Sequence, residues 1–413
     1  MNKHWQEQLK KTWGIDASLT SLDGEFDLNF KASTQDGRQY LMKVMRAACD
    51  TGFVEMQCNV LVHINATGND VKVPTVIRSL AEEKIESIAD EDGDTRLVWV
   101  LDYVDGMIYA HFAPKSLDLI RQLGSGIAHL QRAMSSFSHP ALERDFKWNL
   151  MQADWINESV SAIGDTDRVA LIQAIMLDYQ SARGVAETMA NTVIHNDIND
   201  HNVIVRASLT DKPSLAGIID FGDMCSAPRV CELAIAGAYI VLDHPQAEKA
   251  LAALITGFHS VLPLTGQEID LIYPLLRARL AVSVVNSSLE AIARPDDPYV
   301  VVSQAQAFRY LERDDITPAL LNARLRVACG LSCTDSAQRI QSYLSSEVRN
   351  HCANVLRRNL HQEPCIAFSV ERSSVPQDPF KLSDGEAASL YNGDANPGAV
   401  SYTHLTLPTK RIV

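Results

Sequence analysis

Two polar motifs, separated by short apolar runs, constrain the fold of this chain more than any other feature. Residues His195 to Asn202 read H-x-D-x-x-x-x-N, and Asp220 to Asp223 read D-F-G-D. The runs between them predict a strand, a turn and a returning strand, which would bring Asn202 and Asp220 to the same end of one hairpin. Residue frequencies alone would produce this combination in on the order of 1 in 10,000 chains of this length. The spacing therefore indicates one shared site.

The residue types at this site suit phosphoryl transfer. That reaction needs a carboxylate to orient and deprotonate the attacking hydroxyl, and metal ions to neutralise charge on the nucleotide phosphates. Asp197 fits the first role as catalytic base. Asn202 and Asp220 offer oxygen ligands of the kind that Mg²⁺ prefers. We therefore expect Mg²⁺-dependent transfer of the γ-phosphoryl group of a nucleotide to an alcohol.

Nucleotide-binding candidates lie upstream of these motifs. Lys43 lies in a predicted strand, Tyr40 to Val44, where a lysine would contact the nucleotide phosphates. Glu55 follows in the first turns of a predicted helix and is the candidate partner of Lys43. Other acidic residues of the same region compete with Glu55 for this role, namely Glu82, Glu83 and Glu86.

Two more nucleotide contacts are expected in this region. The edge of the base would pair with backbone near Leu101 and Tyr103, where the last strand of the region ends. The loop that covers the phosphates should be the turn between Leu22 and Phe30. That turn contains a single glycine, Gly24, so it is not a glycine-rich loop.

The hydrophobic pattern predicts an α+β chain with two lobes. Residues 1–103 form a nucleotide-binding N-lobe, mostly β-structure with one helix that Thr51 would cap. Residues 104–330 form a helical C-lobe that carries catalysis and acceptor binding. Residues 331–399 are expected to hold one helix and a linker toward a missing downstream domain. Residues 400–413 resemble a non-native tail.

Composition excludes several other classes of protein. The 413 residues carry a net charge of −14, which argues against a nucleic-acid partner and favours a cationic substrate. The eight cysteines contain no C-x-x-C pair, so we expect reduced thiols. The first fourteen residues are polar and show no secretory signal, and the longest apolar run, Leu233 to Leu242, is too short to cross a membrane. A cytoplasmic protein is expected.

From about Ser18 to Leu325 the chain resembles the aminoglycoside phosphotransferase and choline kinase superfamily, which shares the protein-kinase-like fold. Asn199-Asp200 and the run Gly217 to Met224 are most similar to hydroxylysine kinase-like phosphotransferases. One departure is Asn196, where most relatives carry glycine. The resemblance implies a two-lobed molecule, with a small β-rich N-lobe and a larger helical C-lobe.

The resemblance also implies a function. The acceptor would be a small amino-alcohol, and the donor would be ATP or GTP. An aminoglycoside or other small-alcohol kinase is the enzyme alternative, and a non-catalytic nucleotide-binding regulatory domain is the alternative of another class. Some bacterial relatives fuse such a kinase ahead of a class III aminotransferase domain, and the linker after Gly330 would fit a fusion of that kind.

Smaller signals leave alternatives open. The resemblance gives His195 a structural role in bracing the catalytic loop. Glu232 is expected to be a helix cap or a member of a buried ion pair, for which Arg277 and Arg279 are possible partners. Three aromatic residues are candidates for either the acceptor pocket or the core, namely Trp148, Trp155 and Tyr299.

Overall fold

The computed structural model describes residues 2–22, 27–207, 212–242, 244–294 and 302–332. Several expectations lie outside the described residues. These are the expectations for Gly24, for Tyr299, for the helix and linker after residue 332, and for the tail at 400–413.

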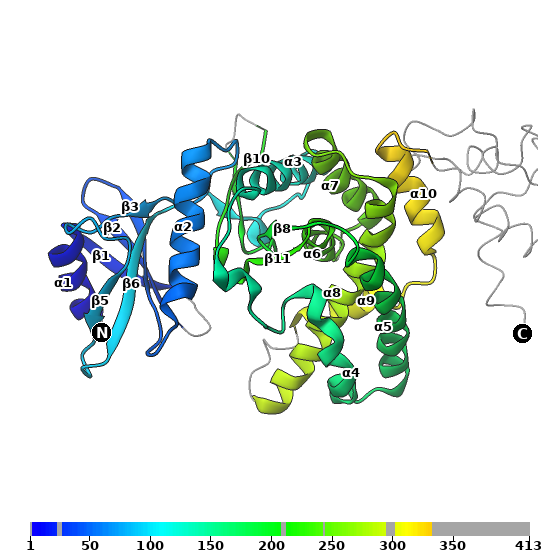
Figure 1. Cartoon of the computed structure of the whole chain (residues 1–413), viewed down its shortest axis with the longest axis horizontal. Helices are drawn as coiled ribbons and strands as arrows, with labels where there is room; N and C mark the ends of the chain where they lie inside the picture. The colour runs from blue at the N-terminus through cyan, green and yellow to red at the C-terminus, as the bar shows by residue number, and fades with distance from the viewer. Residues whose placement is uncertain (1, 23–26, 208–211, 243, 295–301, 333–413) are drawn as a thin grey trace, which may run out of the picture.

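The N-terminal region is an antiparallel sheet with one helix on each face (Figure 1). The strand order is β1-β2-β3-β6-β4, and β5 also pairs with β6. The elements are α1 (Asn2–Trp13), β1 (Ala17–Leu22), β2 (Leu28–Thr34), β3 (Gln39–Val44), α2 (Thr51–Thr67), β4 (Val76–Ile77), β5 (Glu86–Ala89) and β6 (Thr95–Asp102).

Alternation along the strands decides which helix each side chain meets. On one face, Met42 and Val44 join the cluster that contains Trp5 and Leu9 of α1. On the other face, Trp99 belongs to the core that contains α2 and the C-terminal region. Because successive side chains of a strand point to opposite faces, Lys43 lies on the Trp99 side, with its Nζ 5.5 Å from the Trp99 ring centroid.

Two details of this region differ from the sequence analysis. The polar start of the chain is the helix α1, because Trp5, Leu9 and Trp13 recur every four residues and form one buried stripe. The cap of α2 is Asp50, not Thr51, since the Asp50 carboxylate accepts a hydrogen bond of 2.9 Å from the backbone N–H of Phe53.

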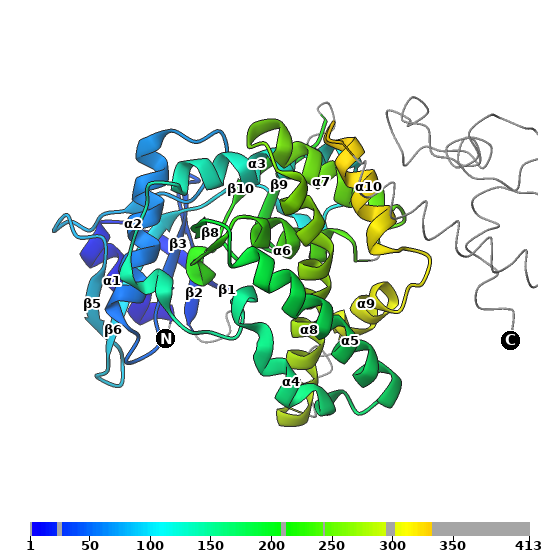
Figure 2. The same cartoon turned by 45° about the vertical axis from the view of Figure 1, so that its right-hand side comes forward.

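The C-terminal region is mostly helical, and Figures 1 and 2 show its helices at the opposite end of the molecule from the sheet. Its helices are α3 (Leu117–Met134), α4 (Ile156–Ser159), α5 (Thr166–Ala186), α6 (Val230–Ile240), α7 (Ala247–Val261), α8 (Gly266–Ala293), α9 (Val302–Leu311) and α10 (Pro318–Ala328). Short 3₁₀ turns are η1 (Tyr109–His111), η2 (Pro140–Glu143), η3 (Leu150–Trp155), η4 (Val160–Ile163) and η5 (Phe221–Asp223). Within the described part of the chain, no helix is both long and apolar enough to cross a membrane.

Two small antiparallel sheets interrupt these helices and carry the polar motifs. Their strands are β7 (Met107–Ile108), β8 (Asn191–Ile194), β9 (Val203–Arg206), β10 (Ser214–Ile218) and β11 (Cys225–Pro228). β9 pairs with β10 and with β7, while β8 pairs with β11. The N–H of Ile219 donates to the carbonyl of Asn202 at 3.0 Å, so the β9–β10 hairpin brings the two motifs to one end, as predicted.

A backbone contact ties the hairpin to the N-terminal region. Lys72 pairs with Gly217 of β10, and the Lys72 carbonyl accepts a hydrogen bond of 3.0 Å from the N–H of Ile218. A Cβ at Gly217 would lie 2.6 Å from the Lys72 carbonyl oxygen. Only glycine allows the two backbones to come this close.

Candidate active site

The loop between β8 and β9, which carries Asp197, is braced through its backbone. The His195 ring donates from Nε2 to the carbonyl of Ile219 at 3.0 Å and accepts from the N–H of Asp197 at its Nδ1. Burial lowers the pKa of His195 to about 4, so the ring is neutral. The buried carboxylate of Glu232 accepts hydrogen bonds from the N–H groups of His195 and Asn196. His195 thus has the bracing role that the resemblance implied.

Asn196 occupies a backbone conformation that favours glycine. Its φ is 65°, in the left-handed region, where asparagine is among the better tolerated residues. Its side-chain amide donates to the carbonyl of Trp148 at 3.2 Å. This geometry explains how Asn196 can stand where relatives carry glycine.

Asp197 is held by donors on both carboxylate oxygens. Oδ2 accepts from the side-chain amides of Asn199 at 3.0 Å and Asn202 at 2.8 Å, and Oδ1 accepts from Nη2 of Arg279 at 3.4 Å. Burial raises the pKa of Asp197 to about 7, although the Arg279 charge acts in the opposite direction. A carboxylate with a pKa near neutrality is suited to accept a proton from a hydroxyl.

Asn202 and Asp220 lie at the same end of the β9–β10 hairpin. The amide nitrogen of Asn202 donates to the carbonyl oxygen and to Oδ2 of Asp197, which leaves its amide oxygen as the end without a hydrogen bond to the loop. Asp220 adopts a left-handed conformation with φ 63°. Nζ of Lys43 lies 3.5 Å from Oδ1 of Asp220, and this lysine holds the pKa of the Asp220 carboxyl below its usual value.

The donor set at this end of the hairpin fits Mg²⁺ held jointly with a nucleotide. Among the described residues, no group of three or more His, Cys, Asp or Glu side chains could hold a metal by itself. Mg²⁺ commonly takes one or two protein oxygens and completes its shell with phosphates and water. The amide oxygen of Asn202 and the carboxylate of Asp220 could supply those two ligands.

Glu55 does not pair with Lys43 in the part of the chain that the structure describes. Glu55 lies on the exposed side of α2, whereas Gln57 is 2% exposed. A Cβ placed on Gly222 would lie 3.8 Å from Oε1 of Gln57, so Gln57 faces the D-F-G turn. In the sequence, Gln57 is a polar residue at a position of α2 that belongs to its buried, mostly apolar face. That pattern could have identified Gln57 as a site residue.

Leu101 and Tyr103 lie where β6 enters the C-terminal region. Leu101 pairs with Leu41 of β3 and with Val76 of β4, and the N–H of Tyr103 donates to the carbonyl of Gln39 at 3.2 Å. Their contact with a nucleotide base stays a prediction.

A sequence model of the phosphotransferase enzyme family matches residues 18–275, more than half of the 413-residue chain. The chain belongs to the phosphotransferase enzyme family. This confirms the resemblance drawn from the motifs.

Known relatives of the chain agree with its assignment to this family. The chain is 26% identical over 298 residues to hydroxylysine kinase of Mus musculus, an alignment that covers 68% of this chain and 78% of the mouse protein. It is 25% identical over 317 residues to hydroxylysine kinase of Danio rerio, covering 74% of this chain and 88% of the fish protein.

Solved structures show that the phosphotransferase has the kinase-like fold. A microcompartment-associated aminopropanol kinase superposes with a TM-score of 0.60 at 17% identity, covering 80% of this chain and 99% of the other. An amicoumacin kinase superposes with a TM-score of 0.55 at 12% identity, covering 75% and 92% of the two chains. The predicted two-lobed α+β fold is confirmed.

Arg144 is a site residue of the phosphotransferase that the sequence analysis did not identify. Its guanidinium donates to the carbonyls of Gly222 at 2.6 Å and Met224 at 2.9 Å, and stacks 4.3 Å from the ring centroid of Phe146. Arg144 therefore fixes the turn that follows Asp220. No sequence pattern indicates this contact, because the acceptors are distant backbone carbonyls.

The ion-pair partner of Arg279 differs from the one expected from the sequence. An ion pair of Arg277 or Arg279 with Glu232 was one expectation, but Arg279 pairs with Asp197. Arg277 points elsewhere and contacts Asp178 at 3.4 Å. Glu232, in turn, binds backbone N–H groups.

A pocket of about 300 Å³ lies in the C-terminal region of the phosphotransferase, lined in part by α8. Trp148 and Tyr239 line it, and both rings also contact the guanidinium of Arg279. Trp148 therefore lines a pocket, and its contact with an acceptor stays a prediction. Trp155 is not among the lining residues and donates from its indole to the carbonyl of Lys147 at 3.1 Å.

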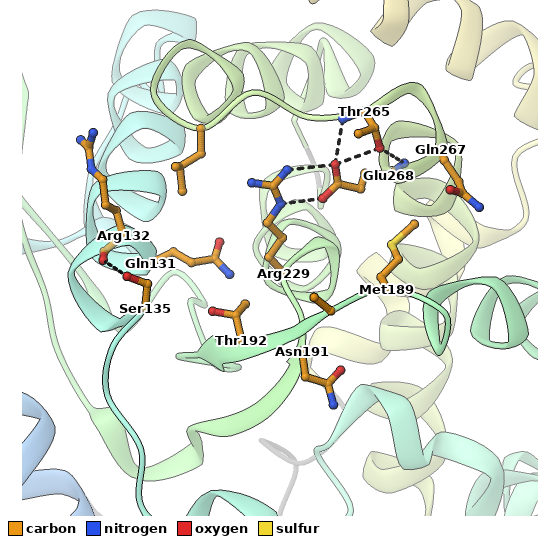
Figure 3. Close-up of a pocket in the computed structure, with 12 residues that line it drawn as sticks. Gln131, Arg132, Ser135, Met189, Asn191, Thr192, Arg229, Thr265, Gln267 and Glu268 are labelled. Carbon is orange, nitrogen blue, oxygen red and sulfur yellow. Dashed lines mark hydrogen bonds and ion pairs between the residues drawn. The ribbon is translucent and has the colours of Figure 1, made fainter.

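A larger pocket, of about 600 Å³, lies at the other end of β8 and β11 (Figure 3). It is lined by residues at the start of β8 and by Arg229, and it includes none of the predicted site residues. Figure 3 shows the guanidinium of Arg229 against the carboxylate of Glu268, which also accepts from Thr265. This pocket is separate from the candidate active site.

Proposed function

We propose that this phosphotransferase is a Mg²⁺-dependent kinase that moves the γ-phosphoryl group of ATP or GTP to the hydroxyl of a small amino-alcohol. One observation carries the proposal. A single hairpin end brings Asp197 within 2.8 Å of Asn202, and Asp220 within 3.5 Å of Lys43. These are the base, the metal ligands and the phosphate-binding lysine that such a reaction requires.

In the proposed reaction, the acceptor hydroxyl docks at Asp197 and its oxygen attacks the γ-phosphorus. A bond forms between the acceptor oxygen and the γ-phosphorus, and the bond from that phosphorus to the bridging oxygen breaks. The hydroxyl proton passes to Asp197, and the nucleoside diphosphate leaves with the bridging oxygen. Lys43 binds the phosphates and holds them in line with the acceptor.

The metal would be held by the amide oxygen of Asn202 and the carboxylate of Asp220. When bound, Mg²⁺ supplies positive charge that offsets the charge of the phosphate oxygens. Nζ of Lys43 lies 3.5 Å from Oδ1 of Asp220, so the lysine and the proposed metal ligand could contact the same phosphates.

Two observations support an amino-alcohol as acceptor. The curated relatives from Mus musculus and Danio rerio are hydroxylysine kinases. The net charge of −14 gives the chain a field that attracts cations. A protonated amine on the acceptor would be recognised by acidic side chains of the helical region.

We also propose a cytoplasmic location. Among the described residues, five cysteines are free thiols, namely Cys49, Cys58, Cys225, Cys231 and Cys329. Free thiols of this kind suit a reducing compartment.

The test is a panel of acceptors assayed for nucleoside diphosphate release with ATP and with GTP. 5-Hydroxylysine is expected to exceed its deaminated analogue by orders of magnitude in kcat/KM, because loss of the amine leaves a buried carboxylate without its partner. Equal rates with neutral sugars would contradict the amino-alcohol assignment. Turnover of aminoglycosides alone would favour that class, and nucleotide binding without turnover of any acceptor would indicate a regulatory domain.

A further inference from the structure

The Arg279 side chain lies deep in the C-terminal region, where it contacts Asp197 of the β8–β9 loop and two rings that line the 300 Å³ pocket. It comes from the middle of α8 and is 3% exposed. Its guanidinium carbon lies 4.6 Å from the ring centroid of Trp148 and 5.7 Å from that of Tyr239. The inference that follows rests on the proposed function, because it concerns the base of that reaction.

The charge of Arg279 is buried, and the negative charges of Asp197 and Asp223 both favour it. A buried cation is costly unless an opposite charge lies close to it. Among the described residues, the one ion pair of Arg279 is with Asp197, and its Nη2 also donates to the hydroxyl of Tyr239 at 3.0 Å. Nε and Nη1 are buried and have no hydrogen-bond partner. The aromatic faces offset part of this cost through cation–π attraction.

The two oxygens of Asp197 are not equally engaged. Oδ2 accepts two hydrogen bonds, from Asn199 and Asn202, whereas Oδ1 accepts, among the described residues, the 3.4 Å contact from Arg279 alone. A carboxylate oxygen has two lone pairs. Oδ1 is therefore the oxygen with a lone pair left for an acceptor hydroxyl, and Arg279 is the side chain that fixes its position.

We propose that Arg279 is the positioning residue of this kinase. Clamped between Trp148 and Tyr239, it holds Oδ1 of Asp197 toward the acceptor. Trp148 and Tyr239 also line the 300 Å³ pocket, so the same two rings contact the arginine and bound that pocket. Arg279 acts through Asp197 and does not itself touch the transferred group.

An activity test separates this role from a merely structural one. Arg279→Met is expected to lower kcat about 10- to 100-fold, the usual cost of a misplaced reacting group, while the KM for nucleotide stays near its wild-type value. Arg279→Ala should regain activity when guanidinium ion is added, because the ion can occupy the vacated space. The matched control is Arg277→Met. Arg277 lies on the same helix but contacts Asp178 instead of Asp197.

A stability test examines the pair without relying on turnover. Thermal unfolding is measured for Arg279→Met, Asp197→Asn and the double variant. Each single change leaves a buried partner behind, so the Tm loss of the double variant should be clearly smaller than the two single losses added together. Arg277→Met combined with Asp197→Asn should show additive losses.

The outcomes distinguish this inference from the proposed function. Wild-type kcat in folded Arg279→Met, or additive Tm losses for the Arg279–Asp197 pair, would overturn the positioning role and leave the kinase assignment intact. A wild-type protein that turns over no acceptor would contradict the proposed function, and the unfolding cycle would still decide whether Arg279 and Asp197 are coupled.

Discussion

The carboxyl group of Asp197 has to meet two demands at once. It needs enough burial to bind a proton near neutral pH, and enough hydrogen bonds to keep one orientation. Burial raises its pKa to about 7, and the amides of Asn199 and Asn202 fix one of its oxygens. The opposing pull of Arg279 keeps the rise in pKa from going further.

Replacing Asp197 by asparagine tests its role as base. Asp197→Asn should keep the fold and Mg²⁺-nucleotide binding but lose about 10²- to 10⁴-fold in kcat, because a positioned general base contributes that much. Steady-state kinetics and a nucleotide titration would measure both. Asp200→Asn, which alters a neighbouring carboxylate that contacts Lys115 at 3.8 Å, is the control. Turnover within about threefold of wild type would remove Asp197 from the mechanism.

Removing the Asp220 carboxylate tests the proposed metal ligand. Asp220→Ala should abolish the Mg²⁺ dependence of nucleotide binding, a larger effect than the about 10- to 100-fold that loss of an outer-shell partner costs at metal sites. Calorimetric titration of the nucleotide with and without Mg²⁺ gives the measurement. Asp178→Ala removes an acidic group that is 60% exposed and should change nothing. Unchanged Mg²⁺ dependence in Asp220→Ala would rule out this ligand.

The proximity of single residues could be predicted from the sequence where a local motif sets their spacing. Asp197, Asn202 and Asp220 stand at set distances along the chain, and the hairpin between them is a short-range structure. Arg144 and Arg279 were not predictable in the same way. Arg144 reaches Gly222, and Arg279 reaches Asp197, across more than 70 positions of sequence, and only the packed structure brings these pairs together.

The elements of the N-terminal region show a similar limit. The strand predicted over Tyr40 to Val44 is β3, which pairs with β2, and this prediction is confirmed. The amphipathic stripe of α1 was overlooked because its three apolar residues are widely spaced within a polar segment. In α2, the pattern located the helix, but the side of the helix on which Glu55 lies depends on how α2 packs against the D-F-G turn.

The start of α8 should depend on pH through Glu268. Burial alone would raise the pKa of Glu268, but hydrogen bonds from Arg229 and Thr265 outweigh burial, and the net pKa is lowered from 4.5. A lowered folded-state pKa means that the pair stabilises the fold above pH 4.5 and that this contribution is lost as pH falls through the lower folded value.

Glu268→Gln is therefore expected to lower stability by about 1.5–3 kcal/mol near neutral pH, the range for hydrogen bonds to charged groups. The Tm difference from wild type should shrink as pH is lowered below 4.5. Thermal unfolding across this range is the measurement. Asp16→Asn, in an exposed pair with Lys10, serves as control with little effect at any pH. A Tm difference that does not change with pH would exclude the ion pair as its cause.

On the scale of the whole molecule, the two regions meet at a backbone contact beside the site. Gly217 and Lys72 approach so closely that a Cβ would also lie 2.8 Å from Cγ1 of Val104. The contact lies just before Asp220, so the position of this proposed metal ligand depends on how the regions dock. Substitution at Gly217 should therefore weaken nucleotide binding.

Gly217→Ala is expected to raise the KM for nucleotide and to speed amide exchange at Ile218, whose N–H donates to Lys72. Hydrogen exchange and steady-state kinetics would record both effects. The matched control is Gly184→Ala in α5, where a Cβ meets nothing within 4 Å. That change should stabilise the helix by about 0.5–1 kcal/mol. Unchanged exchange at Ile218 in Gly217→Ala would show that the contact is not needed.

The Gly217 contact also bears on how genetic data from this chain would be interpreted. A mutational scan scored by activity would place position 217 among the most sensitive sites, alongside Asp197 and Asp220. Glycine has no side chain that could take part in the reaction, so that sensitivity would report the spacing between two backbones. Intolerance to substitution at this position would mark the contact between the two lobes. Mutational sensitivity alone would not distinguish that contact from the active site.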